Sequence, residues 1–176
     1  EDEAFCLQKR FVNEIPMDTD MVCLCNPNNP TGQLIDREVL EQVADYCQKT
    51  DTCLLLDECF HDFLEEGSVH TLLPRVKENP KLFVLRAFTK MYGMAGLRLG
   101  YGICSDTELI RRMEQVTQPW NVSVPAQAAG IAAAREQEFV AVSRQMITEQ
   151  KKLLLAGLEA AGAKVYGSAA NYIFFR

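Results

Sequence analysis

The stretch Arg86–Gly100 reads RAFTKMYGMAGLRLG and contains one lysine and two arginines among small and apolar residues. Lys90 stands in a loop punctuated by glycines that follows a short apolar run, and Arg98 comes eight residues later. Open α/β sheets bind their ligands in the loops that follow their strands. The pair therefore indicates a site that offers an amine and binds an anion.

Two segments upstream also place polar groups at the ends of apolar runs. Asn26–Gly32 (NPNNPTG) follows the run Met21–Cys25, and Asp57 closes the run Cys53–Leu56. The prolines fix the backbone and the glycine permits a left-handed turn, so the first segment can hold an amide rigidly. A bare Asn-Pro pair is usually only a turn, and an aspartate at a strand end is often a helix cap or loop anchor. The seven-residue string is more specific, especially beside the other two segments.

Short apolar runs alternate with helical patterns along the chain, which is typical of an α/β fold with a mostly parallel sheet flanked by helices. Strands are expected at Met21–Cys25, Cys53–Leu56, Leu82–Leu85 and Leu97–Cys104. The expected helices are one from the cap Asp36 to about Thr50, a short one between Pro74 and Pro80, one from Ser105 or Asp106 to about Val116, one at Pro125–Ala134, and a long amphipathic one from Phe139 to about Gly162.

The domain boundary is expected near residue 137. Residues 1–137 are interpreted as part of a large α/β domain, and residues 138–176 as a connecting long helix and the start of a smaller α+β unit. Strands at Lys164–Tyr166 and Asn171–Phe175 would belong to that unit. Because the chain begins with Glu1 and stops in an apolar strand without a turn, we expect a fragment of a longer chain.

Composition narrows the class of protein. The 176 residues are 48% hydrophobic, enough for a real core, and the net charge of −6 argues against nucleic acid as a partner. No apolar stretch approaches the roughly 18 residues of a membrane span and no signal peptide is apparent, so a cytoplasmic location is expected. Seven cysteines without a Cys-x-x-Cys pair predict buried, reduced thiols: Cys6, Cys23, Cys25, Cys47, Cys53, Cys59 and Cys104.

The three polar segments together resemble the class I/II aminotransferases, fold type I enzymes that hold pyridoxal 5'-phosphate (PLP) as a Schiff base on a lysine. The resemblance runs from about Val22 to Arg176. It implies that PLP is the cofactor, that residues 1–137 belong to the PLP-binding large domain, and that the full-length protein is a homodimer. A non-catalytic relative, the aminotransferase-like effector domain of some regulators, is an alternative, but the basic DNA-binding segment of those proteins is not found in this acidic chain.

The resemblance also implies a role for each site residue. Lys90 would carry the Schiff base and move the Cα proton, and Asp57 would keep the pyridine nitrogen of PLP protonated. Arg98 would bind the cofactor phosphate, with a hydroxyl from Thr89, and the Asn29 amide would bond to the phenolic oxygen. The alternatives are a surface lysine and a structural aspartate. The arginine that grips the substrate carboxylate, the stacking ring and a further phosphate loop have no counterpart here, so these residues alone are expected to be inactive.

Two positions depart from the family pattern. Ala87 stands where a serine or threonine is usual, and Phe60, a cofactor-side position, stands where a tyrosine commonly donates to the phenolic oxygen. The strings DECFHDF at Asp57–Phe63 and QPWNV at Gln118–Val122 look closest to the threonine-phosphate decarboxylases, relatives of the histidinol-phosphate aminotransferases. A phosphorylated amino acid is therefore the expected substrate, with decarboxylation modestly favoured over amino transfer.

Four further side chains remain open to interpretation. Trp120 and Asn121 would line the substrate side, although a lone tryptophan is more often part of a core. His61 and His70 have no partners at metal-ligand spacing, so surface or supporting roles are favoured and no metal is expected.

Overall fold

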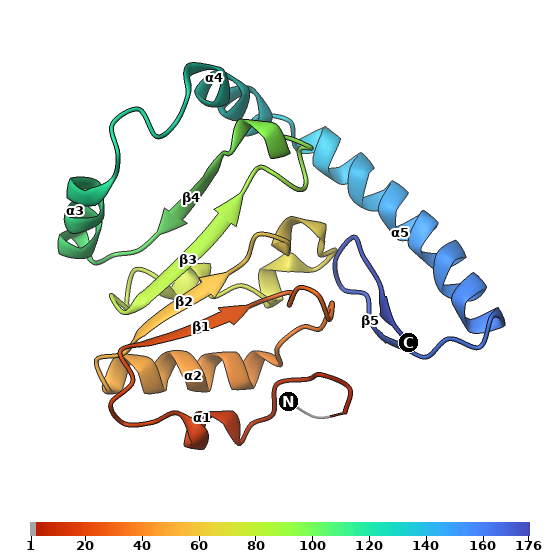
Figure 1. Ribbon diagram of the computed structural model, residues 1–176, viewed down its shortest axis with the longest axis horizontal. Coiled ribbons are helices and arrows are strands. Elements are labelled where there is room, and N and C mark those ends of the chain that lie inside the picture. Colours follow the sequence, from red (N-terminus) through yellow and green to blue (C-terminus); the bar gives the residue numbers. More distant parts are fainter. Residues whose placement is uncertain (1–2) are drawn as a thin grey trace.

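The computed structural model describes residues 3–176, which form a four-stranded mixed sheet flanked by helices and a separate two-stranded sheet (Figure 1). The strands of the larger sheet follow chain order: β1 (Met21–Cys25), β2 (Cys53–Asp57), β3 (Leu82–Ala87) and β4 (Gly100–Ile103). The first three are parallel, and β4 pairs antiparallel with β3. The predicted α/β class with a mostly parallel sheet is confirmed.

One face of the sheet is covered by α2 (Arg37–Lys49), with the short α1 (Phe11–Glu14) beside it (Figure 1). Asp36 begins α2 as predicted, since its carboxylate accepts hydrogen bonds from the backbone N–H groups of Glu38 and Val39. Alternate strand residues point toward this helix because successive side chains of a strand face opposite sides. The buried core joins Val22, Leu54, Leu56, Leu82 and Val84 of the strands to Val39, Leu40, Val43, Ala44 and Cys47 of α2.

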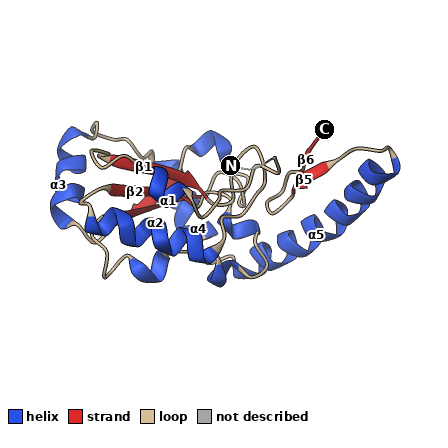
Figure 2. Cartoon of the chain, turned by 90° about the horizontal axis from the view of Figure 1, so that it is seen from below, coloured by secondary structure: helices blue, strands red, loops and turns tan. Residues whose placement is uncertain are grey.

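Three helices follow the sheet: α3 (Thr107–Val116), α4 (Val124–Ala133) and α5 (Gln137–Ala160). Asp106, one of the two predicted caps, accepts hydrogen bonds from the first turn of α3. The long helix α5 extends away from the sheet (Figure 2). None of the helices among the described residues is long and apolar enough to cross a membrane.

The second sheet is a hairpin of β5 (Val165–Gly167) and β6 (Phe174–Phe175) that lies between α5 and the larger sheet (Figure 1). Lys151 of α5 donates to the carbonyl of Ala170 at 3.0 Å. On the other side, the backbone N of Ala169 donates to the carbonyl of Gly32 at 2.9 Å. The loop of the hairpin therefore contacts the segment that follows β1.

Several predicted boundaries are wrong. The segment between Pro74 and Pro80 contains no α-helix, only the end of a 3-10 turn at Leu73–Arg75. The fourth strand begins at Gly100 rather than Leu97, because Ala95–Leu97 form a 3-10 turn and Arg98 is left-handed. Further 3-10 turns are His61–Phe63 and Gly67–Val69.

The thiols also differ from the prediction. Only Cys47 is fully buried, Cys23 is exposed, and the other five are half-buried. The alternation of strand β1 explains Cys23, since it points away from α2 on the face of the sheet that α2 does not cover.

Candidate functional site

Three predicted site residues lie at the carboxyl ends of neighbouring parallel strands. Asn29 follows β1, Asp57 is the last residue of β2, and Lys90 comes three residues after β3. Cys25 pairs in register with Asp57, so the ends of β1 and β2 are level. Because parallel strands end at the same edge of a sheet, the structure brings the three residues to one edge.

Arg98 reaches the same edge by a different route. The strand β4 runs antiparallel to β3 and begins two residues after Arg98, and the backbone N of Phe88 donates to the carbonyl of Leu99 at 3.1 Å. Arg98 has a left-handed backbone (φ 54°, ψ 50°) and an exposed guanidinium whose Nη1 donates to the carbonyl of Ala95 at 3.1 Å. It forms no ion pair within residues 3–176, so its charge is available to an anionic ligand.

Asp57 is half-buried and lacks a cationic partner among the described residues. Its Oδ1 accepts a hydrogen bond from the backbone N of Cys59 at 2.8 Å, and the Cys59 thiol also bonds to this carboxylate. Burial, followed by that hydrogen bond, raises the pKa of Cys59 to about 12, so the thiol stays protonated near neutral pH. A partly desolvated carboxylate without a counter-ion favours a cationic ligand group.

Lys90 has an exposed side chain whose ammonium lies over the ring of Phe60, with Nζ 5.4 Å from the ring centroid. A cation over an aromatic face is attracted by the ring quadrupole, an effect of about 0.5–1 kcal/mol at exposed sites. Phe60 also contacts the ring of Tyr172 edge-on, with centroids 5.1 Å apart, and the ring of Phe63, with centroids 6.2 Å apart. Phe60 thus packs between the amine and the C-terminal segment, and Thr89 is half-buried beside the lysine.

The loop that carries Asn29 is held in place by the hydrogen bonds of its buried first residue, Asn26. Asn26 is fully buried, donates to the carbonyl of His70 at 2.8 Å and accepts from the backbone N of Ile35 at 3.0 Å. Gly32 is left-handed (φ +66°), as predicted from the turn, and a Cβ there would meet the backbone of Gly167 at 3.0 Å. The loop is therefore anchored by its buried first residue, while the Asn29 side chain is exposed.

Tyr172 is a neighbour of the site that sequence reasoning missed. Its hydroxyl donates to the carbonyl of Asn28 at 2.7 Å. Burial, and then the nearby Cys25 and Asp57, raise the pKa of this tyrosine to about 12. The contact joins residues 144 positions apart, so no local pattern could have indicated it.

Trp120 and Asn121 do not lie at the edge of the sheet that carries the other predicted site residues. Both are exposed in the connection between α3 and α4, and Trp120 is 95% exposed with a left-handed backbone (φ 61°). The alternative that Trp120 belongs to a core is wrong. No ring contact of Trp120 is present within residues 3–176.

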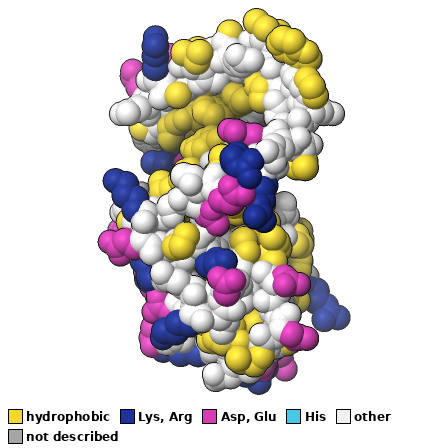
Figure 3. Space-filling model, turned by 90° about the vertical axis from the view of Figure 1, so that its left-hand side faces the viewer, with side chains coloured by type: hydrophobic (Ala, Val, Ile, Leu, Met, Phe, Trp, Pro, Cys, Tyr) yellow, Lys and Arg dark blue, Asp and Glu magenta, His cyan; other side chains and the backbone are white. Residues whose placement is uncertain are grey.

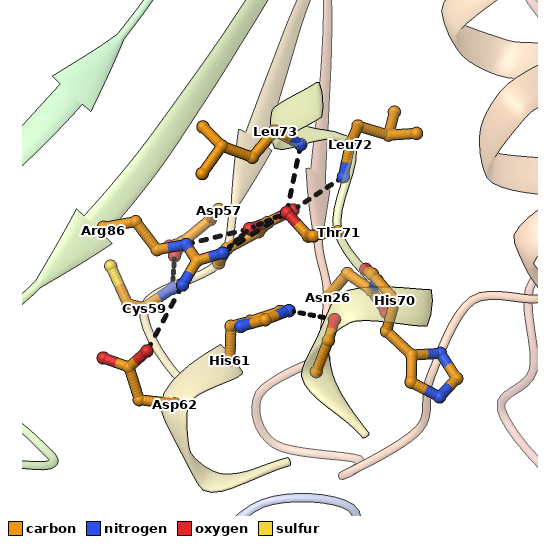
Figure 4. A network of polar contacts seen from close by, with 12 residues as sticks. Asn26, Asp57, Cys59, His61, Asp62, His70, Thr71, Leu72, Leu73 and Arg86 are labelled. Atoms are coloured by element: carbon orange, nitrogen blue, oxygen red, sulfur yellow. Dashed lines mark hydrogen bonds and ion pairs between the residues drawn. The ribbon is translucent and has the colours of Figure 1, made fainter. Parts of the chain in front are cut away.

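His61 is buried rather than on the surface. Its Nε2 lies 2.7 Å from the carbonyl oxygen of Gly67, and burial, followed by the nearby Arg86, lowers the pKa of the imidazole. The half-buried His70 contributes its backbone carbonyl to Asn26. Both histidines support loops beside the site, in the polar network drawn in Figure 4.

A pocket of about 530 Å³ lies at the opposite ends of the strands, lined by residues such as Met21, Cys53 and Phe83 together with Leu109 and Met113 of α3. None of the predicted site residues lines it. The predicted site residues at the carboxyl edge of the sheet therefore form an open wall and do not line this pocket.

The side chains at the carboxyl edge suit PLP chemically. PLP needs an amine for its aldehyde, an acid for its ring nitrogen and a cation for its phosphate. Lys90, Asp57 and Arg98 offer these groups and have no ion-pair partners within residues 3–176. The donor set therefore fits this cofactor.

Comparison with known proteins gives one consistent family. Residues 8–176 match the family model for aminotransferase class I and II. The threonine-phosphate decarboxylase of Salmonella typhimurium is 34% identical over 177 residues, covering 100% of this chain and 48% of that protein. A histidinol-phosphate aminotransferase of Brevibacillus brevis is 37% identical over 155 residues, covering 88% of this chain and 42% of that protein.

A solved structure gives the same result. The histidinol-phosphate aminotransferase from Clostridium acetobutylicum superposes with a TM-score of 0.93 at 29% identity, covering 99% of this chain and 53% of that chain. The chain spans about half the length of the curated relatives it matches.

Proposed function

Because this chain belongs to the class I and II aminotransferase family, we propose that it forms the cofactor-binding wall of a PLP-dependent enzyme that acts on a phosphorylated amino acid. Members of the family are PLP-dependent aminotransferases or decarboxylases. The observation that carries the proposal is the arrangement of Asn29, Asp57, Lys90 and Arg98 along one edge of the sheet.

Each residue has a separate task in this proposal. PLP, when bound, supplies an electron sink for breaking a bond at the substrate Cα. The Lys90 amine attaches the cofactor, and when free it takes up or returns a proton at Cα. Asp57 holds a proton at the ring nitrogen through its unpaired carboxylate.

The remaining contacts orient the cofactor. Arg98 would hold the phosphate, since a guanidinium can grip two oxygens at once, and Thr89 would add a hydroxyl. The Asn29 amide would bond to the phenolic oxygen, a role supported by the loop that Asn26 anchors. Phe60 cannot donate a hydrogen bond, and its ring packs beneath the Lys90 ammonium.

We favour a phosphorylated amino acid, and decarboxylation over amino transfer, on the strings Asp57–Phe63 and Gln118–Val122. Amino transfer from histidinol phosphate to 2-oxoglutarate is the alternative, because relatives of both names are similar to this chain at 34% and 37% identity. Trp120 and Asn121 are proposed to face the substrate in the assembled protein.

Assembly is part of the proposal. We expect a homodimer, supported by exposed apolar side chains in α3, in the following loop and in α4: Val116, Trp120, Val124 and Ile131. Figure 3 views this side of the molecule and shows hydrophobic side chains gathered around a hollow. We propose that residues 138–176 comprise the connecting helix α5 and the start of a second, smaller domain that follows it.

The attachment of PLP to Lys90 can be tested directly. The complete protein is incubated with PLP, reduced with borohydride and digested, and the modified peptide is identified by mass spectrometry. We expect stoichiometric label on Lys90 and none after Lys90→Ala, whereas Lys77→Ala, an exposed lysine outside the site, keeps the label. Stoichiometric label that persists in Lys90→Ala would contradict the proposal.

The reaction branch is decided by its products. Release of carbon dioxide from threonine phosphate, measured with a carboxyl-labelled substrate, is the expected result. Formation of glutamate from 2-oxoglutarate and histidinol phosphate, without release of carbon dioxide, would assign amino transfer instead. Neither product from a protein that carries PLP on Lys90 would contradict both substrate assignments.

A further inference from the structure

We propose that Arg86 and Glu58 are a positioning pair that sets where Lys90 stands relative to Asp57, an inference that rests on the function proposed above. Glu58 directly follows Asp57 at the end of β2, and Arg86 lies in β3 four residues before Lys90. The pair therefore joins the two segments that carry the amine and the acid.

The pair is buried and geometrically specific. The side chains of Glu58 and Arg86 are 0% and 11% exposed. Both Nη2 and Nε of Arg86 approach the same carboxylate oxygen, Glu58 Oε2, at 2.6 and 2.9 Å. That oxygen also accepts the Thr71 hydroxyl at 2.8 Å, and Oε1 accepts the backbone N of Leu72 at 3.2 Å (Figure 4). Both oxygens of the buried carboxylate are thus satisfied.

The position of the pair in the sheet gives it a mechanical role. The register between β2 and β3 ends where Asp57 pairs with Leu85, and the backbone N of Glu58 makes a further hydrogen bond to the Leu85 carbonyl at 3.0 Å. Beyond Leu85, β3 continues alongside β4 only, with Arg86 paired to Tyr101. From that point the Glu58–Arg86 contact, a side-chain contact, links the two segments.

The same guanidinium holds a third segment. Arg86 Nη1 donates to Asp62 Oδ1 at 3.2 Å, and the backbone carbonyl of Asp62 accepts from Nε of Arg144 in α5 at 2.5 Å. The Arg86 guanidinium therefore contacts the carboxylates of both Glu58 and Asp62. A substitution of Arg86 alone would leave both carboxylates without their cationic partner. Because a single replacement of this kind strands a buried charge, the informative variant removes both partners.

Stability alone does not account for such a pair. The desolvation of two buried charges offsets most of their attraction, and apolar replacements of similar volume are often neutral or stabilising. The variant Glu58→Leu/Arg86→Met therefore separates a role in folding from a role in positioning. Arg86→Lys is the second variant, because lysine keeps the charge but lacks the planar fork that contacts Glu58 Oε2 through two N–H groups.

The experiment compares these variants with wild type in the complete protein carrying PLP. Thermal unfolding, kcat, KM and the pH midpoint of the visible absorption of the lysine-bound cofactor are measured. Arg75→Met is the matched control, because Arg75 also pairs with two carboxylates, Glu41 and Asp45, but lies beside α2 away from the strand ends.

For the double variant we expect unfolding close to wild type, a kcat lower by about 100-fold because a misplacement near 1 Å costs about that much, and a KM within about threefold. The pH midpoint of the visible absorption of the lysine-bound cofactor is also expected to shift in the double variant. Arg86→Lys should give a smaller kcat loss, about tenfold, with a shift in the same direction, and Arg75→Met should match wild type in every readout.

Wild-type kcat and absorption midpoint in a folded double variant would overturn the proposal, as would wild-type values in Arg86→Lys. A wild-type protein that fails to attach PLP to Lys90 overturns the proposed function itself, together with this role. That outcome is distinguishable because it appears before any substitution is made.

Discussion

Asp57 is the residue whose environment constrains the chemistry most. It ends a buried strand, accepts a hydrogen bond from the backbone N of Cys59, and lacks a cationic partner within residues 3–176. A carboxylate in this setting stabilises a positive charge more than it would in water, because water screens it less. A protonated ring nitrogen would provide that charge.

We expect Asp57→Asn to retain PLP on Lys90 and to slow turnover, because a neutral amide loses the charge-assisted hydrogen bond to the ring nitrogen. That contact contributes up to about 3 kcal/mol, which corresponds to roughly a 100-fold lower kcat. Cofactor stoichiometry and kcat of the complete protein are measured together. The control Asp51→Asn changes an exposed aspartate at the other end of β2, and equal turnover in the two variants would remove the assigned role.

Single residues also show where sequence reasoning stops. The positions of Asn29, Asp57 and Lys90 at one edge followed from local runs, since parallel strands align their ends. Tyr172 and the Glu58–Arg86 pair were not predicted, because their contacts join residues that are 144 and 28 positions apart. A contact between distant residues leaves no mark in a local pattern.

Helix α2 is the element that holds β1 and β2 from below. Its apolar stripe supplies five of the fourteen residues of the buried core cluster within residues 3–176, and Asp36 satisfies two backbone N–H groups of the first turn. The carboxylate also lies at the positive end of the helix dipole. The cap was predicted because an aspartate directly before an apolar periodic segment is a local signal.

Loss of the cap should therefore weaken the fold. We expect Asp36→Ala to lower the free energy of unfolding by about 1 kcal/mol, measured by denaturant titration, and Asp36→Ser to recover most of it because serine also caps. Asp18→Ala, an exposed aspartate outside any helix, is the control. An unchanged midpoint in Asp36→Ala would show that the cap contributes nothing measurable.

Where prediction failed at this scale, tertiary contacts prevailed over local preference. The segment between Pro74 and Pro80 carries helix formers, but Asn79 is buried and donates to the carbonyl of Ala44 in α2 at 3.3 Å, so the chain turns toward the helix instead. Leu97 looked like a strand residue, yet the left-handed backbone of Arg98 delays β4 until Gly100.

The molecule as a whole leaves its long helix poorly covered. No residue of α5 is fully buried, and large apolar side chains are exposed along it: Phe139, Val142, Met146, Leu153 and Leu154. Contiguous exposed apolar surface of this kind promotes association. The proposed cofactor-binding wall is open as well, because the predicted residues share an edge rather than an enclosed pocket.

We therefore expect the 176 residues on their own to self-associate and to show no turnover, since an open wall cannot orient a substrate, a contribution that can reach about 7–11 kcal/mol. Light scattering and the product assays above are the measurements. Leu153→Glu/Leu154→Glu should reduce association without restoring turnover, whereas Lys152→Glu, a polar change on the same helix, should leave association unchanged. A monomer with the activity of the complete protein would contradict this expectation.

The hydrogen bond between Tyr172 and the carbonyl of Asn28 has a consequence in time. A ribosome adds about 5–20 residues per second, so the 144 positions between them take roughly 7 to 30 seconds to synthesise. During that interval the nascent chain already contains Asn29, and for part of it Asp57 and Lys90, without the tyrosine that later packs against Phe60. A cofactor present in the surroundings would thus meet Lys90 and Phe60 on the emerging polypeptide before Tyr172 has been translated.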